Sequence, residues 1–187
     1  MEQLLQWDTD ILVYLNNLGS KPYDSFWLFI TNQSNWIPLY VLIAVSFFYF
    51  LGWRRGLLAL VVLVISLGIC NEATDFFKAY FDRLRPTQDS MLEGKIRDLL
   101  HPRNRSFISG HSSNSTLLVW FTIFVLRKYT RWVYLLIIWW LLFMYSRIYV
   151  GVHYPLDILA GIAWGFLIWI LAKWVYLKSE RKLFDKD

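Results

Sequence analysis

A histidine and an aspartate four residues apart, His153 and Asp157, are the strongest candidates for chemistry in this sequence. Pro155 lies between them and suits the first turn of a helix, which places Asp157 within that turn. A carboxylate there can accept a hydrogen bond from imidazole Nδ1, leaving Nε2 free as a base or nucleophile. Taken alone, the pair fits a helix-capping acid beside an interfacial histidine better than it fits a catalytic dyad.

Two basic residues, Lys78 and Arg85, are candidates for holding an anion. They are seven residues apart, which is two helical turns, so both side chains are predicted to leave one helix on the same face. Pro86 biases Arg85 away from helical geometry, and the helix is therefore expected to end there. Alone, such a pair is more typical of cations that anchor a helix at a membrane surface.

A third group is the run Ser109-Gly110-His111, which precedes a long apolar segment. The start of a helix presents unpaired N–H groups and the positive end of the helix dipole, both of which favour anions. Gly110 would let the backbone approach an oxyanion closely, and Ser109 would add a hydroxyl donor. The alternatives are that Ser109 is only a helix N-cap and that His111 is an ordinary interfacial histidine.

The composition indicates that membrane-spanning elements position these groups. Of the 187 residues, 57% are hydrophobic, 19% are aromatic and only 18% are charged. Soluble domains average about 45–50% apolar and about 25% charged residues. These values exclude a disordered or collagen-like chain and a nucleic-acid-binding tail, and they favour an integral membrane protein.

Five segments have the apolarity and the length of membrane-spanning helices, about 20 residues, or come close to it. Several of them begin or end at Trp or Tyr, as is usual at the membrane–water interface. We therefore predict an all-α fold, a polytopic membrane helical bundle with about five transmembrane helices and additional N-terminal interfacial helices. The predicted spans are residues 36–53, 56–77, 109–126, 132–149 and 155–177.

The N-terminal region is predicted to lie at the membrane interface. Segments 12–18 and 23–31 are too short and too polar to span, and they read as amphipathic helices. An alternative is a sixth span formed by residues 8–32. The whole chain is predicted to be a single domain, 1–187, made of interfacial helices, a motif-bearing core and a cytoplasmic tail at about 1–35, 36–177 and 178–187.

The net charge of +5 is better explained by membrane orientation than by nucleic-acid binding. Basic residues in short turns without acidic neighbours mark the cytoplasmic side of a membrane protein. Such residues fall at Arg54, Arg55 and in the turn 127–131, and more lie in the tail. The longest polar stretch, Thr87–Phe107, is then predicted to lie outside.

The three candidate groups meet at this outer side, because successive spans alternate in direction. Arg147, at the exit of the fourth predicted span, adds a third cation to Lys78 and Arg85. Charged groups at span ends are costly unless they face a shared polar cavity. Cations and helix amides for the phosphate oxygens, a nucleophile and an acid are what phosphoryl transfer requires. The combination indicates that chemistry and predicts neither a metal nor a cofactor.

The same residues resemble a known signature, that of the type-2 phosphatidic acid phosphatase family, whose superfamily includes the vanadium haloperoxidases. The resemblance covers about residues 36–177, and Ile108 departs from it, because the family usually has proline there. The motif consists of Lys78-x6-Arg85-Pro86, Ser109-Gly110-His111 and Ser146-Arg147-x5-His153-x3-Asp157. The resemblance implies His153 as nucleophile, Asp157 as its orienting partner and His111 as general acid. It also implies a set of phosphate-binding residues: Lys78, Arg85, Ser109, Gly110 and Arg147.

The implied function is metal-independent dephosphorylation of a membrane lipid through a phosphohistidine, with the active site facing the periplasm or cell exterior of a bacterial inner membrane. Undecaprenyl diphosphate is the first expected substrate, since cations in the outer loop would suit a second phosphate. These cations are Lys95, Arg97, Arg103 and Arg105. Phosphatidylglycerol phosphate, phosphatidate and lipid A are the alternative substrates. The expected partners are this lipid and the bilayer, without nucleic acid, and the sequence predicts no particular oligomeric state.

Two functions of other classes stay open, a transporter and a non-catalytic lipid-binding protein. A transporter would use a polar stripe on the second predicted span, at spacings of four, three, four and three residues. The stripe comprises Asn71, Asp75, Lys78, Asp82 and Arg85. We interpret it as the wall of a polar cavity or as support for Lys78. A lipid-binding protein would leave both histidines and Asp157 without an explanation.

Overall fold

A computed structural model describes residues 2–184 of the chain, which form helices and connecting loops without a strand among them. The α-helices are α1 Glu2–Asn17, α2 Asp24–Thr31, α3 Ile37–Phe81, α4 Gly110–Leu126, α5 Leu135–Tyr149 and α6 Pro155–Phe184. Short 3-10 turns lie at Lys21–Tyr23, Gln33–Trp36, Pro86–Gln88, Ser90–Leu92 and Trp132–Tyr134. The prediction of an all-α bundle is confirmed.

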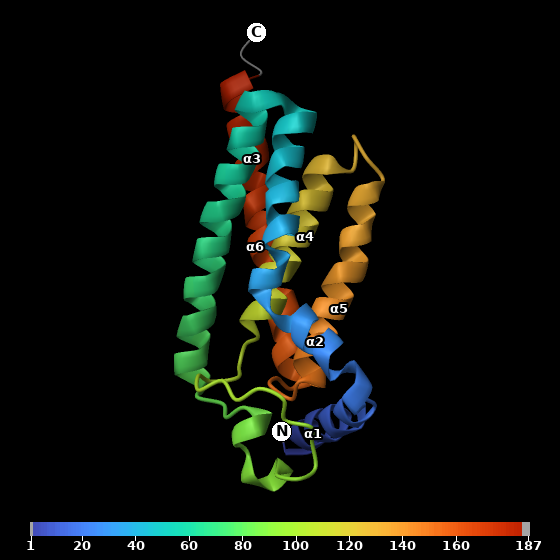
Figure 1. Ribbon diagram of the computed structural model, residues 1–187. Coiled ribbons are helices and arrows are strands. Elements are labelled where there is room, and N and C mark those ends of the chain that lie inside the picture. Colours follow the sequence, from blue (N-terminus) through green and yellow to red (C-terminus); the bar gives the residue numbers. More distant parts are fainter. Residues whose placement is uncertain (1, 185–187) are drawn as a thin grey trace.

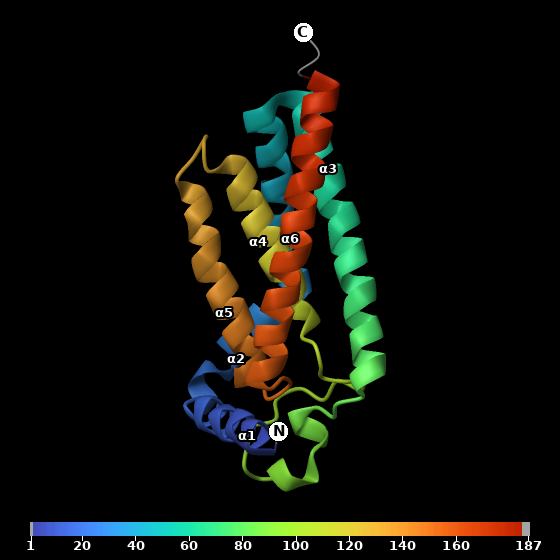
Figure 2. The same cartoon turned by 180° about the vertical axis from the view of Figure 1, so that it is seen from behind.

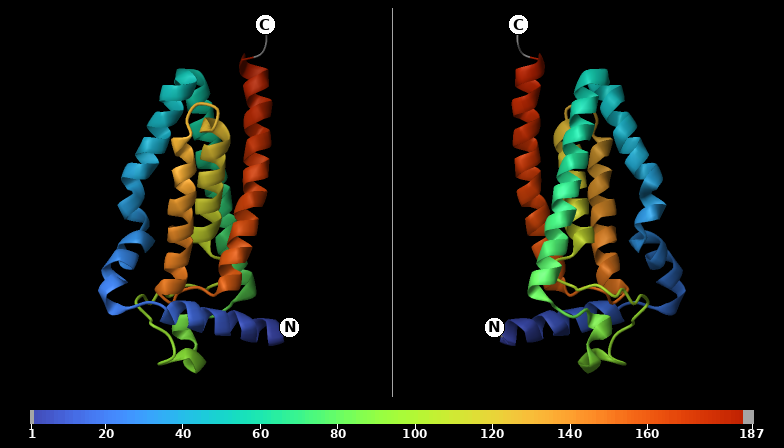
Figure 3. Two further views of the ribbon diagram at one scale, coloured as in Figure 1. Left: turned by 90° about the vertical axis from the view of Figure 1, so that its right-hand side faces the viewer. Right: turned by 90° about the vertical axis from the view of Figure 1, so that its left-hand side faces the viewer.

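Helix α3 is a hairpin of two arms rather than one rod (Figures 1 and 3). The chain turns back at Gly52, whose φ of 74° lies in a region that glycine adopts without steric cost. At Gly56 the arms are in close contact, since a Cβ there would lie 2.8 Å from the carbonyl oxygen of Phe47. The two arms correspond to the first two predicted spans, 36–53 and 56–77.

Helix α4 is the most enclosed element, and α6 packs directly against it (Figure 2). Two glycines on α6 permit this approach. A Cβ on Gly161 would lie 2.6 Å from the carbonyl oxygen of Ser109, and one on Gly165 would overlap the carbonyl oxygen of Ser113. Small residues at helix–helix contacts let backbones approach closely within membranes. The N-termini of α4 and α6, which carry the predicted site residues, are thereby held together.

Three stretches are long and apolar enough to cross a membrane: 33–92, which contains both arms of α3, 132–149 and 155–184. Helix α4 has 17 residues. All five predicted segments are helical and run along the bundle axis, while the number that cross the membrane stays a prediction. Helix α6 runs on to Phe184, so the predicted tail 178–187 begins inside a helix; residues 185–187 lie outside the described part of the chain.

Helix α1 lies across the end of the bundle where α4 and α6 begin (Figure 3). The interfacial helix predicted at 12–18 begins earlier, at Glu2, and ends at Asn17. Its buried face consists of Asp8, Leu12 and Asn16, at a spacing of four residues. The chain between α1 and α2 is interrupted by a turn, so residues 8–32 do not form a single sixth span. The exposed apolar residues Leu4, Trp7, Ile11 and Tyr14 follow a separate ridge along α1, and Leu18 continues it just after the helix ends.

The predicted orientation leads to a labelling result in a Cys70→Ser background. Met91 lies in the outer loop and is 76% exposed, so a membrane-impermeant maleimide is expected to label Met91→Cys in intact spheroplasts. Lys182→Cys, at the opposite end of the bundle, is expected to react only after permeabilisation. Labelling of Lys182→Cys and protection of Met91→Cys in intact spheroplasts would reverse the orientation.

Candidate active site

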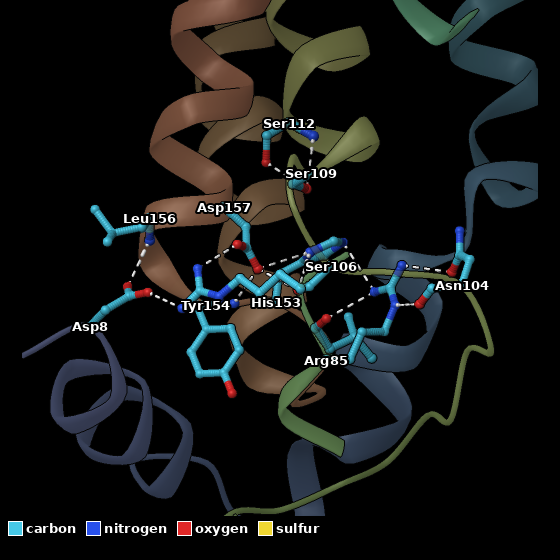
Figure 4. Close-up of polar contacts among 12 residues, drawn as sticks. Asp8, Arg85, Asn104, Ser106, Ser109, Ser112, His153, Tyr154, Leu156 and Asp157 are labelled. Carbon is cyan, nitrogen blue, oxygen red and sulfur yellow. Dashed lines mark hydrogen bonds and ion pairs between the residues drawn. The ribbon is translucent and has the colours of Figure 1, made fainter. Parts of the chain in front are cut away.

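His153 and Asp157 form a buried pair at the start of α6 (Figure 4). The imidazole Nδ1 lies 3.5 Å from Asp157 Oδ2, and the side chains are 2% and 0% exposed. Ser106 joins them, since its hydroxyl donates to Asp157 Oδ2 and lies 3.3 Å from Nδ1. The backbone N–H of Tyr154 donates to the same carboxylate oxygen at 2.9 Å. The carboxylate is thereby fixed on the Nδ1 side of the ring.

The other ring nitrogen of His153 faces a cation. Arg85 Nη1 lies 3.2 Å from His153 Nε2, and it also donates to the carbonyl oxygen of Val152 at 2.8 Å. A guanidinium has donors only, so this contact requires Nε2 to accept and assigns the ring proton to Nδ1. Burial lowers the pKa of His153 to about 3, which leaves the imidazole neutral at pH 7.

Arg85 itself is held from several sides. Its Nε donates to the carbonyl oxygen of Asn104 and its Nη2 to the side-chain oxygen of the same residue, both at 2.8 Å. The expectation that Arg85 shares a helical face with Lys78 is wrong. Helix α3 ends at Phe81 because Asp82 adopts a left-handed conformation, with φ 48°, and Arg85 is extended before Pro86. The loop, and not helical spacing, brings Arg85 to the histidine.

A polar cavity of about 330 Å³ is lined by His153 and by Arg85, the residue that contacts its Nε2. Six of the eight residues predicted for the site line it, so the structure brings them to one place although they come from helices α3, α4 and α5 and from the loops that follow α3 and α5. The lining residues are Gln33, Asn71, Asp75, Lys78, Arg85, Pro102, Asn104, Gly110, His111, Asn114, Arg147 and His153.

The two predicted site residues outside the lining, Ser109 and Asp157, lie behind it. Ser109 caps α4: its hydroxyl accepts from the N–H of Ser112 at 3.4 Å and from the hydroxyl of Ser112 at 3.1 Å. Its backbone N–H donates to the carbonyl oxygen of Asp157 at 3.0 Å. In this arrangement Ser109 positions the start of α4, and Gly110 is the residue that presents the helix N-terminus to the cavity.

The remaining cations line the cavity from two further helices. Lys78 is near the end of α3, where its Nζ donates to Asp75 Oδ1 at 2.9 Å. Arg147, near the end of α5, is only 6% exposed and donates to Thr31 Oγ1 at 2.5 Å. His111, one residue into α4, stacks on Phe143 with ring centroids 5.3 Å apart. Three cations, a helix N-terminus and two imidazoles therefore surround one small space.

Comparison with known proteins decides the family. The sequence model of the PAP2 superfamily matches residues 56–181. This chain belongs to the PAP2 superfamily. A lipid A 4'-phosphatase from Porphyromonas gingivalis is 30% identical, over 97% of this chain and 78% of the relative. An undecaprenyl-diphosphatase from Sulfolobus acidocaldarius is 26% identical, over 95% of this chain and 79% of the relative.

The fold agrees with this assignment. A crystal structure of a transmembrane PAP2 type phosphatidylglycerolphosphate phosphatase from Bacillus subtilis superimposes with a TM-score of 0.73 at 26% identity, covering 95% of this chain and 88% of that one. The chain is thus a lipid phosphatase and an integral membrane protein, as the sequence predicted.

Several residues around this PAP2 site cannot be recognised from sequence motifs. Ser106 and Asn104 come from an irregular loop, and no spacing rule connects them to His153 or Arg85. Arg83 stands in none of the motifs, yet it donates to Asp157 Oδ1 at 2.7 Å. Asp8, the residue that pairs with Arg83 at 2.6 Å, is 75 positions away in sequence. Only the folded chain brings these partners together.

The stripe proposed on the second span is only partly present. Asn71, Asp75 and Lys78 line the polar cavity together. Asp82, however, leaves the helix and pairs with Arg105, whose Nε lies 2.5 Å from Asp82 Oδ1. A transporter pathway along α3 would therefore lack the outer part of the predicted stripe, Asp82 and Arg85, because neither residue belongs to the helix.

The loop cations do not face the polar cavity of this PAP2 enzyme. Arg97 pairs with Asp24, and this hydrogen bond lowers the pKa of the Asp24 carboxyl. Arg105 pairs with Asp82, and none of Lys95, Arg97, Arg103 and Arg105 is among the lining residues. These four side chains are the cations expected to bind a second phosphate, so the diphosphate substrate stays a prediction without support from the geometry.

A second cavity, of about 350 Å³, adjoins the polar one. It shares Gln33, His111 and Asn114 with the polar cavity, and its other walls are mostly apolar. They come from both arms of α3, from α4 and from α5: Tyr40, Ile43, Ala44, Leu60, Leu63, Val64, Leu67, Ser115, Leu118, Trp139 and Phe143. A phosphate group and an apolar chain could therefore occupy neighbouring spaces on either side of His111.

Proposed function

We propose that this PAP2 protein hydrolyses a membrane lipid phosphate monoester through a phosphohistidine at His153. The observation that carries the proposal is the assigned state of this ring: Nε2 is unprotonated and points at a cation-lined cavity, while Nδ1 faces Asp157. A neutral imidazole oriented by a carboxylate is an activated nucleophile. Arg147 adds support, because its buried Nε finds no hydrogen-bond partner among residues 2–184 and is available to a phosphate oxygen.

The reaction has two displacement steps. Nε2 of His153 releases its hydrogen bond from Arg85, attacks phosphorus and forms a P–N bond as the P–O bond to the lipid breaks, and the freed Arg85 donor turns to a phosphate oxygen. His111 gives its proton to the departing lipid oxygen. His111 then takes a proton from water, whose oxygen attacks phosphorus and breaks the P–N bond to release inorganic phosphate. Lys78, Arg85 and Arg147 stabilise the negative charge on the phosphate oxygens in both steps.

The first proposed substrate is a lipid A phosphate. The relative named lipid A 4'-phosphatase is more similar than the relative named undecaprenyl-diphosphatase, at 30% against 26% identity. One small cavity with three cations suits one phosphate group, and the apolar cavity beyond His111 suits the acyl part of a lipid. Undecaprenyl diphosphate, phosphatidylglycerol phosphate and phosphatidate are the competing substrates. We place the enzyme in the bacterial inner membrane with this site on the outer face.

The test is hydrolysis by the purified protein in detergent, with EDTA present throughout, compared for these four lipids. We expect phosphate release without added metal and the highest kcat/KM for lipid A, and no release by His153→Asn. A tenfold higher kcat/KM for undecaprenyl diphosphate would move the substrate assignment to the diphosphate. Loss of activity on chelation that magnesium restores would contradict the mechanism, and inactivity on all four lipids would contradict the function.

The role of His111 as acid leads to a result that depends on the leaving group. His111→Asn is expected to slow lipid hydrolysis by about a hundredfold or more, the usual worth of general acid catalysis. With p-nitrophenyl phosphate, whose leaving group needs no proton, the rate of phosphoenzyme formation is expected to fall far less. The measurement is the pre-steady-state burst of p-nitrophenol. Equal losses on both substrates would contradict the acid role.

A further inference from the structure

Helix α1 contributes a buried carboxylate to the surroundings of the active site (Figure 4). Asp8 is 3% exposed. Its Oδ1 accepts from the backbone N–H of Leu156 at 2.8 Å, and its Oδ2 accepts from Arg83 Nη2 at 2.6 Å. Leu156 immediately precedes Asp157 at the start of α6. A single side chain of α1 thus contacts both the backbone beside Asp157 and the arginine that binds Asp157.

Arg83 links the two carboxylates. Its Nη2 binds Asp8, and its Nη1 donates to Asp157 Oδ1 at 2.7 Å. The guanidinium also lies over the ring of Tyr154, 3.9 Å from its centroid. A planar guanidinium with a carboxylate on each of two nitrogens and an aromatic ring against its face has little freedom to rotate. The position of Asp157 Oδ1 is therefore defined by a group whose other end is fixed by α1.

This arrangement divides the two oxygens of Asp157 between two tasks. Oδ1 is taken by Arg83, so Oδ2 is the oxygen left for Ser106 and His153 Nδ1. A buried carboxylate costs free energy unless it is paired and hydrogen-bonded. Burial raises the pKa of Asp8, opposed by its hydrogen bonds from Arg83 and Leu156. An apolar residue at position 8 could attach α1 to the bundle without this cost. The buried carboxylate of Asp8 therefore indicates a role beyond attaching the helix.

We propose that Asp8 is a positioning residue for the phosphatase reaction, acting through Arg83 on the catalytic Asp157. The inference rests on the proposed function, because it assigns Asp8 to the orientation of the His153 nucleophile. Asp8 touches neither the polar cavity nor the reacting atoms. Without its charge, Arg83 would bind Asp157 alone and would be free to turn, and the carboxylate would orient and stabilise the His153 ring less well. The chemical steps would slow while lipid binding stayed the same.

The test compares two substitutions on the same buried face of α1. Asp8→Asn keeps the size of the side chain and removes its charge. Asn16→Ala is the matched control, because Asn16 anchors the same helix by donating to the carbonyl oxygens of Ile148 and Tyr149 at 3.0 and 2.9 Å, and its hydrogen bonds reach neither Arg83 nor Asp157. For Asp8→Asn we expect kcat to fall by about tenfold or more, with KM within about twofold of wild type. For Asn16→Ala we expect a lower melting temperature and an unchanged kcat.

A double variant separates positioning from a purely structural role. If Asp8 acts through Arg83, then Asp8→Asn should cost almost nothing further in an Arg83→Gln background. If Asp8→Asn lowered kcat by the same factor in the Arg83→Gln background as in the wild type, the two residues would act independently and the proposal would be overturned. An unchanged kcat for Asp8→Asn would also overturn the proposal. The same holds if both Asp8→Asn and Asn16→Ala lowered kcat in proportion to the drop in melting temperature, because the effect would then be one of stability alone. These outcomes all require an active wild-type enzyme, so inactivity of the wild type on every lipid phosphate would instead count against the proposed function.

Discussion

Replacing His153 by asparagine is expected to reduce lipid phosphate hydrolysis by several orders of magnitude, on the order of 10⁴-fold or more. The physical reason is that Nε2 is the atom that would bond to phosphorus in the proposed mechanism, so its loss would remove a reaction step rather than a contact. His153 is buried beside Ser106 and Asp157, so the replacement must be polar and must not be larger than histidine. Asparagine meets both conditions. The measurement is single-turnover phosphate release, together with acid-stable and acid-labile labelling of the protein from a radiolabelled lipid phosphate.

The control for this variant is another histidine of the same chain. His101 has a side chain that is 66% exposed and lies outside the polar cavity, so His101→Asn is expected to keep wild-type turnover. Both variants should show the wild-type melting temperature in detergent. Phosphate release by His153→Asn at a rate near that of wild type would sink the nucleophilic mechanism.

Removing Arg85 is expected to have the second largest effect. Arg85→Ala should lower kcat by about 10²- to 10³-fold, the usual loss when one donor that stabilises transition-state charge is removed. The variant also leaves the carbonyl oxygens of Val152 and Asn104 without their donor. Arg85→Lys should restore only a small part of the activity, because an ammonium cannot make the same set of divergent hydrogen bonds. Binding of vanadate, which resembles the five-coordinate phosphorus, should weaken in parallel with kcat.

Arg103→Ala provides the comparison for Arg85, since it removes a loop cation that does not line the cavity. It is expected to leave kcat and vanadate inhibition unchanged. If Arg103→Ala and Arg85→Ala were equally impaired, the effect would come from the net charge of the outer face rather than from a defined phosphate site. Steady-state kinetics and vanadate titration on the same preparations give both readouts.

Much of the fold was predictable because hydropathy acts over continuous stretches of the chain. The predicted segments 109–126 and 132–149 coincide with helical segments of the structure, and Pro155 is the first residue of α6, as its fixed φ suggested. Helix α1 was harder, because its buried face combines Asp8 and Asn16 with a single leucine. Polar residues on a buried face defeat a rule that reads apolar positions as the packed side.

The site was predictable to the extent that its chemistry lies in short motifs. His153, Asp157 and His111 stand in such motifs, and the fold places them at one end of the bundle. The prediction that Lys78 and Arg85 share one helical face is wrong because the left-handed conformation of Asp82 ends α3 before Arg85. Helix propensities do not reveal this local change of conformation. Ser106 and Asp8 could not be found at all, since their importance arises only from contacts across long separations in sequence.

The two glycines where α6 meets α4 restrict how this enzyme can vary in evolution. No layer of side chains separates the two backbones there, so any side chain added at Gly161 meets the carbonyl group of Ser109 directly. That carbonyl belongs to the residue that caps α4, and the displaced helix carries Asp157. A change as small as one methyl group at Gly161, which does not line the polar cavity, would alter the distance between the start of α4, which we propose binds phosphate, and the proposed nucleophile His153. Substitutions should therefore be tolerated mainly on the lipid-facing surfaces, and hardly at all at Gly161 and Gly165, where α6 contacts α4.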